Sequence, residues 1–274
     1  MKKSLGVVLT IASAAGLLVV LQSCGVLGGA PTDVQLGTDS TGVNVLVVWN
    51  QPAEGIPDKY QIHFKALGET TYALLAETTA QSYRHETGGM TGTYKVTALF
   101  PGSSYEGDDR PTTVPYRTDT ITVAELDASG NSGYGWNRET GLGRTYSMAK
   151  ENCGYVDCYI TNFETGSAML PYCIASPSMA PSDRGGPVEP AEWKASGFTD
   201  QLASEQNPLP QRGPTTYFNW TDITQQPSII GCSCVDGFYA LVKITSVDAG
   251  VGEVRLLSWF QLVPGLRLVR HEVN

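Results

Sequence analysis

Val43-Asn44-Val45-Leu46-Val47-Val48-Trp49-Asn50 is the stretch of this chain that decides its fold. Its odd-numbered positions, three valines and Trp49, alternate with the even-numbered ones. A period of two places these two sets on opposite faces of an extended strand. Valine and tryptophan are also enriched in strands. The stretch therefore predicts a β-strand with one apolar face.

The same alternation recurs on both sides of this strand. Apolar residues occupy every second position in residues 60–64 and 94–98, and shorter strands are expected at 71–76 and, after a polar loop over 101–111, near 112–117. Short strands separated by turn residues predict a β-sandwich. The mature chain shows no long 3.6-residue period, which argues against an all-α fold.

Residues 31–116 resemble a fibronectin type III domain. The resemblance rests on Pro31 at the entry, Trp49, Tyr60 and the segment Tyr94-Lys95-Val96-Thr97-Ala98. It implies that Trp49 and Tyr60 fill the space between two sheets and that Tyr94 caps a corner. The chain departs from the family pattern near Gly88, where a leucine is expected. The resemblance implies a spacer or a binding module and no chemistry.

Residues 117–274 predict a second, cysteine-containing β-sandwich or jelly-roll-like domain, so the fold class expected is all-β. Its expected strands are at 121–126, 155–161, 168–174, 217–223, 237–247 and 253–263, with an edge strand at 266–269. The last two long strands predict a hairpin around 248–252. Residues 127–136 are rich in glycine and predict a loop. Residues 176–214 predict a long loop that holds a short helix at 193–203.

Residues 1–23 predict a signal peptide that forms a helix. Lys2 and Lys3 precede an apolar run over 5–21, which ends in Leu21-Gln22-Ser23-Cys24. This order of charge, apolar core and small-residue cleavage site is typical of secretory signals. Two alternatives are an ordinary signal peptide with a chance cysteine and an uncleaved transmembrane helix, for which the run is short.

The tetrad that ends in Cys24 resembles the lipobox of bacterial lipoproteins. The resemblance implies cleavage before Cys24, acylation of this residue with palmitate-type chains, and a lipidated tether over 24–30. It places the protein in the bacterial cell envelope. Gly25 after the cysteine favours the outer membrane, on either its periplasmic or its surface-exposed face.

The charge balance excludes one class of partner. The chain has 18 basic and 27 acidic residues, a net charge of −9, and loss of Lys2 and Lys3 with the signal leaves 16 basic residues and a net charge of −11. Nucleic acid requires clustered lysine and arginine, so we expect no nucleic-acid partner. Anionic lipid would repel this body, and the predicted membrane contact is therefore the lipid anchor alone.

Six cysteines are present, and one of them, Cys24, is the lipobox cysteine. The other five are disulfide candidates in an exported protein: Cys153, Cys158, Cys173, Cys232 and Cys234. Five thiols allow at most two bridges. Cys232 and Cys234 would share a face if residues 231–235 are extended. A zinc site is the alternative, but the spacing lacks the usual paired hooks.

Catalytic motifs are missing from the sequence. His63, His85 and His271 share no motif with a nucleophile, and we expect all three at the surface. No Gly-x-Ser-x-Gly elbow or His-Glu-x-x-His helix occurs. We therefore expect no catalytic residue, no metal and no cofactor.

Four aromatic residues are candidates for ligand binding: Tyr134, Trp136, Trp193 and Trp220. Exposed aromatic rings on loops stack on sugars or anchor protein partners, although core packing is the alternative. Arg138 and Glu139 could form a salt-bridged loop clamp. The sequence favours a lipid-anchored, non-catalytic binding or adhesion module with a glycan or an envelope protein as partner. The alternatives are a structural component of an envelope assembly and a small glycan-acting enzyme.

Overall fold

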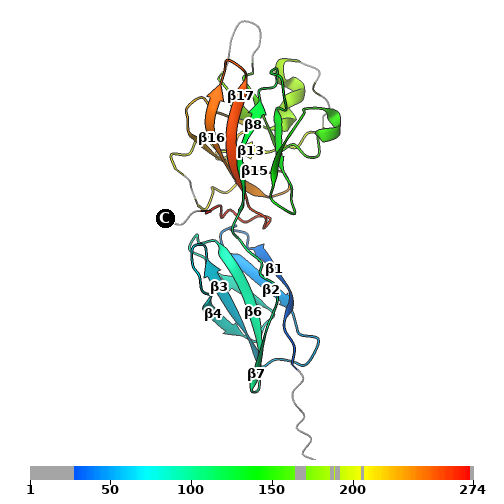
Figure 1. The fold of residues 1–274 in the computed structure, drawn as a ribbon, viewed down its shortest axis with the longest axis vertical. Helices are drawn as coiled ribbons and strands as arrows, with labels where there is room; N and C mark the ends of the chain where they lie inside the picture. The colour runs from blue at the N-terminus through cyan, green and yellow to red at the C-terminus, as the bar shows by residue number, and fades with distance from the viewer. Residues whose placement is uncertain (1–27, 164–170, 186–187, 189–191, 205–206, 272–274) are drawn as a thin grey trace, which may run out of the picture.

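The chain forms two β-sandwiches stacked end to end in the computed structural model (Figure 1). The structure describes residues 28–163, 171–185, 188, 192–204 and 207–271. The expected signal peptide and Cys24 lie outside these residues. Gly28 packs against Tyr105 in the hairpin that forms the far end of the first sandwich, away from the second (Figure 1). Within the described ranges, no helix is long and apolar enough to cross a membrane.

The first sandwich pairs a three-stranded sheet with a four-stranded sheet, both antiparallel. The smaller sheet has the order β1 (Thr32–Thr38), β2 (Val45–Asn50), β5 (Ser82–His85). The larger sheet has the order β4 (Ala73–Thr78), β3 (Lys59–Ala66), β6 (Gly92–Phe100), β7 (Ser103–Glu106). This arrangement is the fibronectin type III-like β-sandwich that the sequence predicts.

The alternating residues form the core between these two sheets, as expected. Val45, Val47 and Trp49 of β2 are buried, and the exposed or half-buried residues between them face outward. The ring of Trp49 meets the ring of Tyr60 edge-on, with 5.2 Å between centroids. Such edge-to-face contacts add to the stabilisation from buried area.

Three expectations for the first sandwich were wrong. Its last strand is β7, which lies inside the predicted polar loop, because Gly102 adopts a positive φ of 78° and lets the chain reverse directly after β6. Of the strand expected near 112–117, residue 112 makes an isolated bridge to Thr93 of β6, and residues 116–117 begin a strand of the second sandwich. His85 is buried at the end of β5, a strand that the sequence analysis missed, and its Nδ1 is 2.8 Å from the Tyr94 hydroxyl. Burial lowers the pKa of His85.

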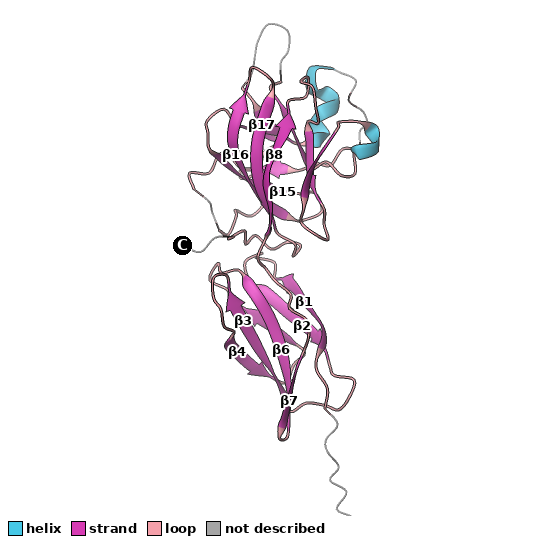
Figure 2. Cartoon of the chain, viewed as in Figure 1, coloured by secondary structure: helices cyan, strands magenta, loops and turns pink. Residues whose placement is uncertain are grey.

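The second sandwich consists of two five-stranded sheets. The first has the order β10 (Gly143–Tyr146), β9 (Gly133–Trp136), β11 (Cys158–Thr161), β12 (Cys173–Ala175), β14 (Trp220–Asp222). The second has the order β13 (Gly197–Phe198), β15 (Ser228–Ser233), β16 (Tyr239–Asp248), β17 (Glu253–Phe260), β8 (Tyr116–Ala124). Two 3-10 helices, η1 (Lys150–Asn152) and η2 (Pro177–Gly185), lie on one side of this sandwich (Figure 2).

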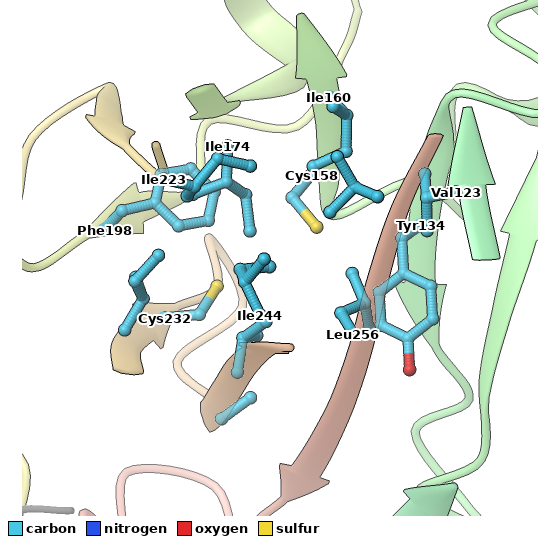
Figure 3. Close-up of a cluster of buried hydrophobic side chains, with 14 of the residues drawn as sticks. Val123, Tyr134, Cys158, Ile160, Ile174, Phe198, Ile223, Cys232, Ile244 and Leu256 are labelled. Carbon is cyan, nitrogen blue, oxygen red and sulfur yellow. The ribbon is translucent and has the colours of Figure 1, made fainter. Parts of the chain in front are cut away.

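A large apolar cluster fills the space between these sheets (Figure 3). Both sheets contribute: Ile160 and Ile174 come from one, and Ile244 and Leu256 from the other. The predicted hairpin between β16 and β17 is present, with Asp248 opposite Glu253. The all-β expectation is confirmed.

The loop predicted at residues 127–136 from its glycine content was partly wrong, because its last four residues form β9. A Cβ at Gly135 would lie 1.8 Å from the carbonyl oxygen of Tyr155, and one at Gly143 would lie 1.8 Å from the Tyr134 hydroxyl. Glycine inside a strand often marks such a close approach. These glycines allow dense packing in β9 and β10 and do not break the strands.

The expected helix at 193–203 and the expected strand at 266–269 are both absent from the described residues. Residues 197–198 form β13 instead, paired with Cys232 and Ser233 of β15. Residues 266–269 have no regular secondary structure. They belong to a segment, residues 261–270, that leaves β17 and runs between the two sandwiches (Figure 1).

This C-terminal segment completes the core of the first sandwich. Val263, Leu266 and Leu268 are buried in the same apolar cluster as Trp49 and Tyr94. The Arg267 amide donates to the Gly42 carbonyl (2.7 Å), the Thr91 hydroxyl donates to the Arg270 carbonyl (2.7 Å), and the Gln261 side-chain amide donates to the Thr113 carbonyl (2.8 Å). Apolar burial and hydrogen bonds together hold the sandwiches against each other.

We expect Leu266→Ala to destabilise the first sandwich, although residue 266 follows the last strand of the second. Loss of a fully buried leucine side chain costs about 2–5 kcal/mol. Amide hydrogen exchange in β2 and β6 should therefore accelerate. Val251→Ala, at an exposed hairpin tip (61% exposed), is the control and should leave the exchange unchanged. Wild-type exchange in β2 and β6 of the Leu266 variant would contradict this packing.

Candidate ligand-binding groove

The structure buries three of the four aromatic candidates and exposes the fourth. Tyr134, Trp136 and Trp193 are buried in the second sandwich, so these side chains do not present a surface to a ligand. The Tyr134 hydroxyl and the Trp136 indole nitrogen meet the Ser258 hydroxyl at 2.8 and 2.9 Å. Trp220 is 44% exposed. The core-packing alternative therefore holds for three of the four.

Trp220 lies in a groove of about 510 Å³. Its lining comprises two aromatic rings, two carboxylates, two side-chain amides and a threonine: Phe218, Trp220, Asp200, Asp222, Gln201, Gln225 and Thr221. Asp200 and Asp222 are both exposed. Among these lining residues the formal charge is −2, with no basic side chain.

The groove forms where the chain crosses from one sheet to the other. Phe218 pairs with Phe198 of β13 through two backbone hydrogen bonds of 2.8 Å. Two residues later, Trp220 pairs with Ala175 of β12 in the opposite sheet. The groove is thus built on backbone from both sheets of the second sandwich.

Strand alternation aims the groove side chains outward. Thr221 and Ile223 are buried, while Trp220 and Asp222 of β14 are exposed, and Phe218, which precedes the strand, is exposed as well. The Trp220 ring also meets Phe163 edge-on, with 5.8 Å between ring centroids. This contact restrains the indole without covering all of it.

Hydrogen bonds hold the polar wall of the groove. The Gln201 amide donates to the Gln225 carbonyl at 2.8 Å and to the Ser228 hydroxyl at 2.6 Å. The Thr224 amide donates to Oδ1 of Asp222 at 2.6 Å. Burial raises the pKa of the Cys173 thiol to about 12, with the charges of Asp222 and Asp183 adding to the effect.

Arg138 forms the loop clamp that the sequence suggested, but with other partners than Glu139. Its guanidinium makes two bonds of 2.7 Å to the buried Asp157 carboxylate and two more, of 2.7 and 3.1 Å, to Asp236. Lys194 adds a bond of 3.1 Å to Asp157. Burial alone would lower the pKa of Arg138, and the bonds to Asp157 and Asp236 raise it above its usual value. This network connects loops of the second sandwich.

All five described cysteines are free thiols in this structure. Cys158, Cys232 and Cys234 are buried in the core of the second sandwich. Figure 3 shows the sulfur atoms of Cys158 and Cys232 directed into the space between the sheets. Cys173 donates to the Pro171 carbonyl at 3.2 Å, and Cys153 is half-buried after η1. Cys232 and Cys234 therefore share a face, as the sequence suggested.

Comparisons with known proteins assign no family. No family model matches the chain, and no curated protein matches it. Among solved structures, "Structure of FN3tt mut" is 15% identical with a TM-score of 0.25, covering 31% of this chain and 89% of that one. "Titin kinase and its flanking domains" is 8% identical with a TM-score of 0.26, covering 87% of this chain and 38% of that one. The strand order described above defines the fold independently of both.

Phe218, Asp200 and Asp222 were not among the site residues expected from the sequence. The local pattern pointed the other way, because alternation of Phe218 and Trp220 with the polar residues Asn219 and Thr221 predicts that the two aromatic rings lie on a buried face. No sequence signal joins Asp200 to them. Its place in the groove depends on the pairing of Phe198 with Phe218.

We expect Arg138→Ala to destabilise the second sandwich by about 3 kcal/mol, since it removes a partner from a buried carboxylate. Urea unfolding at neutral pH measures this loss as a lower midpoint. Glu139→Gln is the neighbouring control, because Glu139 is exposed and outside the network. An unchanged midpoint for the Arg138 variant would show that the network contributes no net stability.

Proposed function

We propose that this protein binds a glycan through the groove at β14 and is held in the bacterial cell envelope by a lipid on Cys24. The observation that carries the glycan proposal is the exposed pair Phe218 and Trp220, aimed to the same side beside two carboxylates. Aromatic faces pack against the C–H faces of sugar rings. Carboxylates and amides hydrogen-bond the ring hydroxyls.

The shape of the groove favours a glycan over a protein surface. Its volume of about 510 Å³ lies within the range of about 300–1,000 Å³ that is typical of small-molecule pockets. Its lining combines apolar rings with a few placed polar groups, as such pockets do. We therefore select the glycan from the two partner classes that the sequence left open. The proposed role is binding without catalysis.

The placement of the groove suits a protein anchored by its N-terminus. The described chain begins at Gly28, at the end of the first sandwich remote from the second (Figure 1). A lipid at Cys24 would therefore leave the whole first sandwich between the bilayer and the groove. Two or more acyl chains hold a protein on a membrane far better than one. We propose the outer membrane, on the strength of Gly25.

Export also supports a disulfide in the second sandwich. We place it between Cys158 and either Cys232 or Cys234, because the three thiols lie in one cluster: Cys158 belongs to β11, Cys232 to β15 of the facing sheet, and Cys234 directly follows β15. Formation would transfer two electrons and two protons from the thiols to an exported disulfide donor, which is reduced to its dithiol. Such a bridge would join the two sheets.

A glycan array probed with the mature protein tests the proposed binding. We expect Trp220→Ala to weaken the affinity about ten-fold or more, because about 1.4 kcal/mol of lost apolar contact corresponds to that factor. Tyr155→Ala is the matched control, since Tyr155 is 60% exposed and lies outside the groove. Unchanged binding by the Trp220 variant, or no glycan bound by the wild type, would refute the assignment. Analysis of the recovered glycans reports any cleavage.

We expect Cys24→Ser, exported behind an ordinary cleavable signal peptide, to leave the protein in the soluble fraction, because the acyl chains provide the only proposed membrane contact of the mature chain. Cell fractionation measures the release, and Cys153→Ser serves as a control that should remain with the membranes. Mass spectrometry of the membrane-derived wild type should show acyl chains on Cys24 and report the state of the other thiols. Persistent membrane association of the Cys24 variant would contradict the anchor.

A further inference from the structure

The charge of the groove restricts the class of sugar that it can take. Its two ionisable lining residues, Asp200 and Asp222, are both acidic, and the chain as a whole carries a net charge of −9. Uronic acids and sulfated sugars bring negative charge to these carboxylates and would be repelled. A ligand with a positive charge would be attracted.

The aromatic rings add to this preference for a cation. The faces of tryptophan and phenylalanine attract cations placed over them within about 6 Å. Phe218 and Trp220 supply such rings next to the carboxylates of Asp200 and Asp222. Aromatic faces combined with carboxylates are complementary to an ammonium group, which bonds to both.

Strand geometry places the two kinds of group at a suitable spacing. Trp220 and Asp222 are two residues apart on the same side of β14, so their Cα atoms are separated by roughly 6–7 Å. A sugar ring stacked on Trp220 would present its substituents to the Asp222 carboxylate. The Thr224 amide engages one oxygen of Asp222, which fixes the direction of this carboxylate.

We propose that the groove prefers glycans with free, protonated amines, that is, de-N-acetylated amino sugars, over N-acetylated or neutral glycans of the same length. This inference rests on the proposed glycan-binding function. The amine would pair with Asp222 and Asp200 while the sugar ring stacks on Trp220. N-acetylation removes the positive charge and therefore the pairing.

The test compares three β-1,4-linked tetramers: glucosamine, N-acetylglucosamine and glucose. The protein is the mature chain from residue 24, with Cys24→Ser, and calorimetry measures each affinity. We expect the glucosamine tetramer to bind about five-fold more tightly than the other two at low salt, in line with one exposed ion pair. The advantage should vanish near 1 M salt, where the screening length is about 3 Å.

Isosteric variants separate charge from shape. Asp222→Asn and Asp200→Asn should each lower the ratio of the glucosamine-tetramer affinity to the glucose-tetramer affinity. Asp119→Asn removes a highly exposed carboxylate in β8, outside the groove, and should change neither affinity. Trp220→Ala should weaken the binding of all three tetramers.

The outcomes distinguish this inference from the function on which it rests. Equal binding of all three tetramers, lost in Trp220→Ala, would overturn the amine preference and leave the glycan function standing. An amine preference that survives both aspartate variants would also overturn it. Failure of the wild type to bind any glycan on the array would refute the function itself.

Discussion

The packing of residues 261–270 against the end of the first sandwich is the contact on which the arrangement of this molecule depends. Val263, Leu266 and Leu268 belong to the core of a sandwich whose own strands end at Glu106. Burial of these side chains removes apolar surface from both sandwiches at once. The hydrogen bonds of Arg267 to Gly42 and Thr41 then fix the angle between the two. The position of the groove relative to the N-terminal end of the molecule depends on this contact, to which Asn207 adds a hydrogen bond to the Gly89 carbonyl.

Within the second sandwich, hydrogen bonds to a buried carboxylate hold the loops together. Asp157 is fully buried and accepts bonds from Arg138, Lys194 and the amide of Trp136. A buried carboxylate without such partners would be strongly destabilising. The groove lies at another edge of the same sandwich, where backbone pairing positions the aromatic residues. The buried carboxylate of Asp157 is thus paired inside the sandwich, whereas the carboxylates of Asp200 and Asp222 in the groove are exposed to solvent.

Patterns of local origin were predictable from the sequence, and contacts between distant segments were not. The alternation at Trp49 and Tyr60 correctly predicted two faces of a sandwich, because a period of two is a property of a single strand. The glycine-rich segment around Gly135 predicted a loop. The structure needs glycine there because the Tyr155 backbone approaches closely, and no local pattern contains this tertiary contact. Trp136 and Trp193 were candidates for the same reason, since burial depends on partners far along the chain. Trp220, one of the four candidates, is exposed, but the approach of Asp200 to it depends on the bridge between Phe198 and Phe218.

The C-terminal segment also bears on the order in which the chain becomes structured. During synthesis the N-terminal part of a protein emerges first and can begin to fold before the rest exists. Here the first sandwich lacks three of its core side chains until residue 268 has been made. Its full stability therefore arrives only when the chain is nearly complete. Until then, the leading half of the chain is less stable than it is in the finished protein.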